Sequence, residues 1–405
     1  MRAALVAALA AGLLLVVSGC GSSTAATDPL GQDAASLVPP SAVAFVTANS
    51  HLDSDQWGAI KKLAPAGSVG PDLIRDLPAA FGDQVTLAVL GIDNGNPDAI
   101  AIAKPKDESK LRAFAEKYSQ GGEHYTIEHV SGWSVVADSD AAFQAVRDAS
   151  AGTSLADTEE IKNGMAKLGG SAVAKIYASG EGLKLLPAQT RALLGSPQWV
   201  AARVEGAKDS VLVDARASGP SSLPTYKPTL LRDVPSGSIL AVSFKDASKL
   251  PFLQQYLSGV TGEGVLYIVP GAILPVITLE VQTQHPAAAE LEFRKIARQI
   301  GKNVPLKVER HGSKVLLTTA ARGLTGGGKS IVDDKAFKDA LESVDAPDQV
   351  AFLAYADVNR LAPLIQAFGP LLSKGGSSKV EIPKDLDTLV AWGGAARVEA
   401  RLTVR

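Results

Sequence analysis

Cysteine is almost absent from this 405-residue sequence, and the single cysteine is Cys20. No intramolecular disulfide can form, so the folded parts of the chain must be held together by their hydrophobic cores. A thiol nucleophile is excluded everywhere after position 20. Aromatic residues make up only 5% of the chain, whereas 46% of its residues are hydrophobic. We therefore expect a globular protein with a core built mainly from Ala, Val and Leu.

Histidine is also scarce, and the five histidines are His51, His124, His129, His285 and His311. Only His124 and His129 are close in sequence, and their odd spacing would place them on opposite faces of a strand. The sequence has no H-E-x-x-H metal motif and no G-x-S-x-G nucleophile elbow. These absences predict no metal, no cofactor and no catalytic residues, and they favour a protein that is not an enzyme.

No apolar segment is long enough for a comfortable transmembrane helix. The apolar run Ala3–Val17 follows Arg2 and suits the core of a signal peptide instead. It leads into Val17-Ser-Gly-Cys20, which resembles the bacterial lipoprotein signal, in which small residues precede a cysteine. The resemblance implies cleavage before Cys20, a diacylglyceryl thioether on its sulfur and often acylation of its new amino group. The alternative is an ordinary secretory signal that contains a cysteine by chance.

We therefore expect a lipoprotein signal peptide over residues 1–19 and a lipidated Cys20 with a flexible tether over residues 20–36. Two acyl chains anchor a protein stably, so the chain is predicted to be lipid-anchored on the extracytoplasmic face of the cell membrane. The formal net charge of −2 is close to neutral for this length, and nucleic acid is not an expected partner.

The two halves of the sequence resemble each other. The segment Val38–Val46 matches Val234–Val242, with a proline followed by an apolar strand. Further on, the helical segment at Leu111 matches that at Leu291, and Ser154-Leu-Ala-Asp157 matches Ser330-Ile-Val-Asp333. Val85–Val89 is matched to the strand that begins at Val265, and the turn Ser131-Gly132 to His311-Gly312. We predict a first lobe over residues 37–217, a Pro/Ser-rich linker over 218–228 and a second lobe over 229–405 that repeats the first.

Each half shows the same order of expected elements: strand, helix, two strands, helix, two strands, helix, strand, helix, two strands. Strands joined by short turns must be antiparallel, because a parallel pair needs a longer crossover. The expected fold class is α+β, with two duplicated lobes. Each lobe is predicted to be an antiparallel or mixed sheet with helices packed mainly on one face.

The segment Gly323-Leu-Thr-Gly-Gly-Gly-Lys-Ser330, GLTGGGKS, fits the phosphate-loop pattern at every required position. In a phosphate loop, however, Lys and Ser lie in the first turn of the following helix. Asp333 is a good N-cap here, so the helix is expected to begin after Lys329 and Ser330. The matching loop Ala149–Ser154 lacks the motif altogether. We predict no nucleotide binding.

Charge is distributed unevenly between the halves. Residues 294–329 contain nine basic residues and one acid, Glu309, whereas the matching residues 114–149 contain two basic residues and six acids. The candidate face for an anionic partner comprises Arg294, Lys295, Arg298, Lys302, Lys307 and Arg310. Its expected partner is an anionic lipid, a wall polymer or another envelope protein. A second functional interpretation is that the basic and acidic faces attract each other, within one molecule or between molecules. The alternative to both is two solvated faces that have diverged without function.

The phrases Leu37–Val46, Asp53-Ser-Asp-Gln-Trp57 and Ser154–Asp157 together resemble an uncharacterised family of envelope proteins from Gram-positive bacteria, known only as a domain of unknown function. The second half lacks the D-Q-W element. The resemblance implies no catalytic residues. The favoured function is binding or scaffolding by a non-enzymatic, lipid-anchored envelope protein. The alternative is a carrier of a lipid or another apolar ligand at the membrane surface.

Overall fold

The computed structural model describes residues 32–63, 71–93, 96–119, 124–165, 168, 172–186, 197–218, 224–247, 257, 260–271, 274–300, 305–320, 328–372, 384–394 and 396–405. Cys20, Lys302 and residues 323–327 of the GLTGGGKS segment lie outside the described residues. The chain divides into two compact units between Gly219 and Pro220, both of which fall in the segment predicted as a linker. Each unit is described by itself below.

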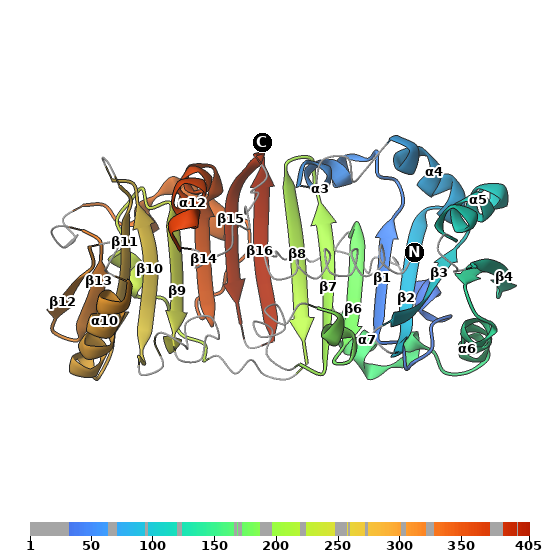
Figure 1. The fold of residues 1–405 in the computed structure, drawn as a ribbon, viewed down its shortest axis with the longest axis horizontal. Coiled ribbons are helices and arrows are strands. Elements are labelled where there is room, and N and C mark those ends of the chain that lie inside the picture. The colour runs from blue at the N-terminus through green and yellow to red at the C-terminus, as the bar shows by residue number, and fades with distance from the viewer. Residues whose placement is uncertain are drawn as a thin grey trace. The chain divides into compact units, whose positions relative to one another are not determined.

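The first unit contains a sheet of eight described strands. They are β1 (Ala44–Asn49), β2 (Gln84–Asp93), β3 (Asn96–Ala103), β4 (Thr126–Val130), β5 (Trp133–Ala137), β6 (Ala174–Ser179), β7 (Trp199–Gly206) and β8 (Ser210–Ala217). Within this unit they follow the order β8-β7-β6-β1-β2-β3-β5-β4, and every pair is antiparallel (Figure 1). The turn between β4 and β5 needs positive φ at both Ser131 and Gly132, as a two-residue type I′ hairpin requires.

Helices pack on both faces of this sheet. The first-unit helices are α2 (Gln32–Ala35), α3 (Gly58–Leu63), α4 (Pro71–Phe81), α5 (Glu108–Tyr118), α6 (Asp140–Ala151) and α7 (Glu159–Asn163), with the 3-10 turns η1 (Asp55–Trp57), η2 (Leu155–Asp157) and η4 (Gly182–Leu185). On β3, Ile100 and Ile102 join the core under α6, whereas Ala101 and Ala103 join a second core under α4 and α5. The prediction of helices mainly on one face is therefore wrong here, because β3 is apolar on both sides.

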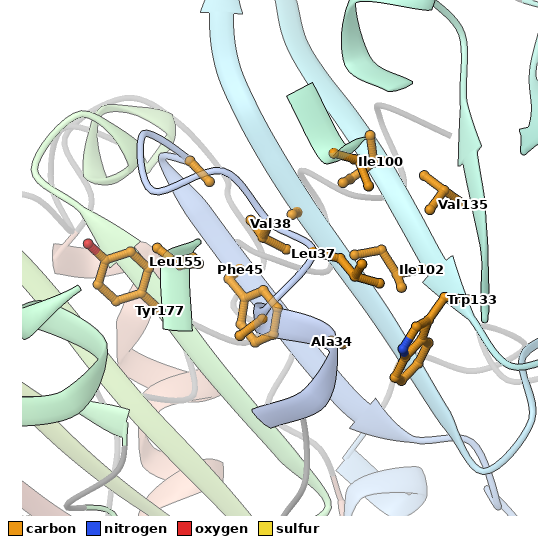
Figure 2. Close-up of a cluster of buried hydrophobic side chains, with 14 of the residues drawn as sticks. Ala34, Leu37, Val38, Phe45, Ile100, Ile102, Trp133, Val135, Leu155 and Tyr177 are labelled. Carbon is orange, nitrogen blue, oxygen red and sulfur yellow. The ribbon is translucent and has the colours of Figure 1, made fainter. Parts of the chain in front are cut away.

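The larger core of the first unit lies under α2, α6 and η2. Figure 2 shows its side chains, including Phe45 and Tyr177 from the central strands and Trp133 from β5. Phe143 and Val146 project into it from α6 and are nearly fully buried. Since the chain contributes no disulfide, this contiguous apolar burial is the main source of stability for the unit.

The second unit also has eight described strands. They are β9 (Leu240–Lys245), β10 (Glu263–Val269), β11 (Val276–Gln282), β12 (Lys307–His311), β13 (Lys314–Thr318), β14 (Phe352–Asp357), β15 (Leu386–Gly393) and β16 (Arg397–Val404). Their order within the unit is β16-β15-β14-β9-β10-β11-β13-β12, again antiparallel throughout. The second unit therefore repeats the strand order of the first: β9 takes the place of β1, β10 that of β2, and so on to β16, which takes the place of β8. The fold class α+β is confirmed.

Helices also cover both faces of the second sheet. They are α10 (Pro286–Ile300), α11 (Lys335–Glu342) and α12 (Val358–Leu372), with the 3-10 turns η5 (Leu230–Arg232) and η7 (Ile331–Asp333). Phe293 of α10 is buried in the core formed with Phe244 of β9. On the opposite face, Phe337 of α11 packs edge-on against Tyr355 of β14, with ring centroids 5.3 Å apart.

Among the described strands, β4 and β12 stand at the end of their sheets, and each pairs with one neighbour, β5 and β13 respectively. Both contain five residues. The sequence of β12 is Lys-Val-Glu-Arg-His, and its side chains are exposed or half-buried. Polar side chains of this kind are typical of strands that lie at an edge.

The pairing registers correct two of the matches expected from the sequence. Thr86 pairs with Thr47 of β1, and Val265 pairs with Ser243 of β9. Thr47 and Ser243 occupy the same position of the central strand, so Val265 is the equivalent of Thr86. The β12–β13 turn is Gly312-Ser313, since His311 pairs with Lys314. The sequence matched Val85 with Val265 and Ser131-Gly132 with His311-Gly312, so both were wrong by one residue. A slip of one residue moves a side chain to the other face of the sheet.

Candidate functional site

The described end of the GLTGGGKS segment has a structural role. Ser330 is the N-cap of η7, and its Oγ accepts a hydrogen bond from the Val332 N–H and donates one to the Leu231 carbonyl, at 3.3 and 3.0 Å. The Asp333 carboxylate accepts from the Ser330 N–H and completes a capping box. Ser154 and Asp157 form the same box at η2. Both polar groups of Ser330 are therefore used inside the fold.

The α-helix after this segment begins at Lys335, so the prediction that Lys329 and Ser330 precede it is confirmed. The predicted N-cap is wrong by one residue, because Asp334 and not Asp333 occupies that position. The Asp334 carboxylate does not cap the helix. It accepts hydrogen bonds from the Ser236 hydroxyl and from the Gly237 N–H instead. The absence of nucleotide binding stays a prediction.

The structure separates the residues of the predicted basic face. Arg294, Lys295 and Arg298 lie on α10, and Arg310 approaches α10 from β12, since it and Arg294 both contact Glu290. Side chains alternate along a strand, so Lys307 points to the face opposite Arg310. Lys302 lies outside the described residues. Only four of the six predicted residues thus share one side of the sheet.

Acidic residues neutralise much of that face. Glu290 lies 2.7 Å from Arg294, and Glu292 lies 2.6 Å from Lys295. The Arg294 side chain lowers the pKa of the Glu290 carboxyl by hydrogen bonding to it. Both glutamates precede the sequence window that gave the excess of positive charge. Among the described residues, Arg298 has no carboxylate within ion-pair distance, and its Nε donates to the Arg294 carbonyl at 3.2 Å.

A more distinctive feature is a face that is apolar in the first unit and polar in the second. In the first unit, five neighbouring positions on β3 and β5 pack under α6: Ile100, Ile102, Trp133, Val135 and Ala137. The pairing registers place five residues at the same positions of the second sheet: Thr278, Glu280, Lys314, Leu316 and Thr318. Only Leu316 remains apolar. We call these five residues the polar face.

The change of side chains accompanies a shorter connection between the last strand of this face and the following 3-10 turn. In the first unit, α6 occupies most of the connection between β5 and η2. The equivalent connection of the second unit, residues 319–330, is five residues shorter, and its described residues 319, 320 and 328–330 form no α-helix. Four residues of the polar face are buried, Glu280 among them at 4% exposed, and Lys314 is half-buried. Buried polar groups require partners, and neighbouring side chains supply them.

Glu280, Lys314 and Asp233 form a linked ion-pair group. The Lys314 Nζ lies 2.6 Å from the Asp233 Oδ2 and 3.3 Å from the Glu280 Oε1. Burial raises the pKa of Glu280, against the attraction of Lys314. Burial alone would lower the pKa of Lys314, but the hydrogen bond to Asp233 and the charge of Glu280 outweigh it and raise the pKa. The ammonium is favoured because it lies close to both carboxylates.

Hydroxyl groups extend the same cluster. The Oγ1 atoms of Thr278 and Thr318 lie 2.8 Å apart. Tyr267 of β10 is adjacent, and burial raises the pKa of its phenol to about 12, so it is a neutral hydroxyl at physiological pH. The cluster therefore offers one ammonium, two carboxylates and three hydroxyls within one part of the sheet. Such a set can bind a hydrogen-bonding ligand or a polar segment of another protein, and it contains no activated nucleophile.

The first unit has its own buried charges. Thr86, Thr47, Lys175, Arg203 and Asp214 form a row across β2, β1, β6, β7 and β8, in which each residue pairs with the next. The Arg203 Nε lies 3.5 Å from the Asp214 Oδ2, and its Nη1 lies 3.2 Å from the Glu205 Oε2. Sequence reasoning missed this row. Its signal was one or two charged residues inside each of three otherwise apolar strands.

The histidines are not gathered. His51 contacts Asp83 at 3.0 Å, His129 contacts Glu108 at 3.2 Å and His311 contacts Glu309 at 3.3 Å, all on exposed side chains. No group of three metal-ligating side chains occurs among the described residues. No helix in the described part of the chain is long and apolar enough to cross a membrane.

Comparisons with known proteins give little. No family model matches the chain, and no curated protein matches it. Crystal form III of a protein called TP0453 is 10% identical, with a TM-score of 0.23, over 70% of this chain and 91% of that chain. Crystal form I of TP0453 is 10% identical, with a TM-score of 0.22, over 73% and 94%. Scores this low carry no argument about fold or function.

Proposed function

We propose that this chain is a non-enzymatic, lipid-anchored protein of the cell envelope that acts by binding or scaffolding. The segment that ends at Cys20 supports the anchor. We further propose that the two units are copies of one duplicated unit. Their identical strand orders and the matching capping boxes at Ser154 and Ser330 support the duplication.

The observation that carries the binding function is the difference between the matched faces. If both copies served only to build a core, each would keep apolar residues under a helix such as α6. The second copy has hydrogen-bonding side chains at four of five matched positions. Burying such groups costs free energy unless they are paired, so the exchange does not favour stability. We therefore assign the binding function to the second unit and a structural function to the first.

The anchor is tested in the native host by changing Cys20 to Ala. The wild-type protein should sediment with membranes, and mass spectrometry should find a diacylglyceryl group on Cys20. The variant should leave the membrane fraction or accumulate as the uncleaved precursor. A wild-type N-terminal peptide without lipid would contradict the anchor, whatever the second unit binds.

Binding is tested by placing a photo-crosslinking amino acid at Arg232, which is exposed and precedes Asp233 of the cluster. The control position is Asp209, which is an exposed residue of the first unit. We expect a discrete adduct in cells from position 232 that is lost when Glu280→Gln and Lys314→Met are added. No adduct at 232, or the same adduct at both positions, would contradict the assignment. A stoichiometric lipid in an organic extract of the purified protein would instead favour the carrier.

A further inference from the structure

The hairpin between β10 and β11 exposes large apolar side chains. Among the described residues only three large hydrophobic side chains are exposed: Leu274 at 57%, Ile277 at 39% and Leu291 at 53%. Single exposed hydrophobic residues are common on soluble proteins, and Leu291 on α10 needs no explanation. Leu274 and Ile277, however, stand together at one hairpin, beside the part-exposed Val276.

This hairpin is also free of charge. No charged residue occurs between Glu263 and Glu280, and Pro270 and Pro275 flank the tip. The matching hairpin of the first unit, between β2 and β3, carries Asp93 and Asp98. Moving a carboxylate from water to an apolar medium is very costly. The second-unit hairpin can leave water without that cost, whereas the first-unit hairpin cannot.

Hydrogen bonds at Ile277 anchor the β11 side of the hairpin. The Ile277 N–H donates to the Thr319 Oγ1, and the Ile277 carbonyl accepts from the Thr319 N–H, both at 3.0 Å. Val269 pairs with Val276 at the end of the ladder. At Gly271 an added Cβ would lie 2.0 Å from the Leu274 carbonyl oxygen, so only glycine permits this tight return of the chain. An apolar medium requires paired backbone groups, and Ile277 meets this requirement through Thr319.

We propose that the β10–β11 tip, through Leu274 and Ile277, inserts into the interfacial region of a lipid bilayer and forms a second contact beside the N-terminal anchor. Protein interfaces are enriched in Tyr, Trp and Arg, and the tip has none of these between Ile268 and Ile277. It has only aliphatic side chains, glycine and proline, which gain free energy from leaving water and make no directional contacts. The bilayer is the partner that such chemistry fits.

The proposal depends on the proposed function only in that the anchor brings the protein to a membrane. The insertion itself is therefore measured without the anchor. A chain that begins at Gly21 keeps every described residue and contains no cysteine. Leu274→Cys then introduces a unique thiol, which can carry an environment-sensitive NBD fluorophore. Leu291→Cys is the matched control, because it is an exposed leucine of the same unit on the surface of α10.

Both labelled proteins are titrated with vesicles of 70% phosphatidylcholine and 30% phosphatidylglycerol. We expect emission from position 274 to rise several-fold with a blue shift, and to be quenched by a spin label on the lipid acyl chains. Position 291 should change little. An unchanged signal at 274, or an equal response at 291, would overturn the proposal. Since neither labelled protein carries lipid, failure here leaves the Cys20 anchor untouched, and an unlipidated Cys20 leaves this result untouched.

A second measurement uses sedimentation with the same vesicles and no label. The Leu274→Asp, Ile277→Asp double variant should lower the partition coefficient at least ten-fold, and Leu291→Asp should change it less than two-fold. Because the three side chains are exposed, none of the changes should unfold the protein. Equal partitioning of the double variant and the wild type would overturn the proposal.

Discussion

Arg203 and Asp214 face each other across β7 and β8 with their side chains 2% and 4% exposed. A buried pair of this kind is costly to desolvate, and breaking it leaves one charge without adequate compensation. We therefore expect Asp214→Ala to lower the free energy of unfolding by about 3–5 kcal/mol, as measured by urea denaturation. Glu205→Gln, at the more exposed partner of Arg203, should cost less than about 1 kcal/mol.

The double variant Arg203→Met, Asp214→Leu separates charge from packing. Replacing both ions with apolar side chains should recover most of the lost stability, because neither member of this pair is left buried without the other. A double variant as unstable as Asp214→Ala would show that the row is held by shape and not by electrostatics.

The two capping boxes should contribute equally to the free energy of unfolding if Ser330 has only a structural role. Ser154→Ala and Ser330→Ala each remove an N-cap, and each should lower stability by about 1 kcal/mol in thermal or urea unfolding. In isothermal titration with Mg-ATP, neither the wild type nor the Ser330→Ala variant should give a heat of binding. Saturable binding by the wild type that Ser330→Ala abolishes would revive the phosphate loop.

The polar face should make stability depend on pH through Glu280. Its folded pKa lies above the ordinary value of 4.5, so the folded state binds the proton more tightly than the unfolded state. The stabilisation is full below 4.5 and is lost as pH rises through the folded pKa. Glu280→Gln, which cannot ionise, should flatten this fall in an unfolding series above pH 4. An identical slope in wild type and variant would mean that Glu280 has no raised pKa.

The helix α6 should be energetically important only through its buried side. Phe143 is 1% exposed in the core that Figure 2 shows in part, so Phe143→Ala should cost about 3–5 kcal/mol by loss of burial and by cavity formation. Gln144→Ala, on the exposed side of the same helix, should change stability by less than about 0.5 kcal/mol. Differential scanning calorimetry of both variants tests this.

Much of the fold was predictable from the sequence, because hairpins and apolar runs are local signals. The order of strands and helices in the first unit, the antiparallel pairing and the start of the helix after Ser330 all follow from such signals. The placement of helices did not, because β3 has Ile on one face and Ala on the other, so both faces are apolar and no alternation with polar residues is visible. The strand match slipped by one residue because adjacent strand residues resemble each other in type. The turn match slipped because it aligned two glycines that occupy different positions of their turns.

The candidate site was less accessible to sequence reasoning. The sequence window that gave the basic excess began at Arg294 and so excluded Glu290 and Glu292. These glutamates lie one helical turn before Arg294 and Lys295, form ion pairs with them and lower the positive charge of that face. The polar face needs the pairing register of two sheets, since Ile102 and Glu280 become equivalent only when the strands are counted from the centre outward. A match of sequence alone gives no such count.

The short terminal strand β12 affects how neighbouring molecules meet. An exposed strand can recruit a strand from another molecule and begin an aggregate. Three of the five residues of β12 are charged: Lys307, Glu309 and Arg310. Charged side chains on an edge strand make the addition of another strand unfavourable. Copies held by the proposed Cys20 anchor would diffuse in two dimensions and collide often. At such a surface, a charged edge would keep crowded molecules from joining their sheets.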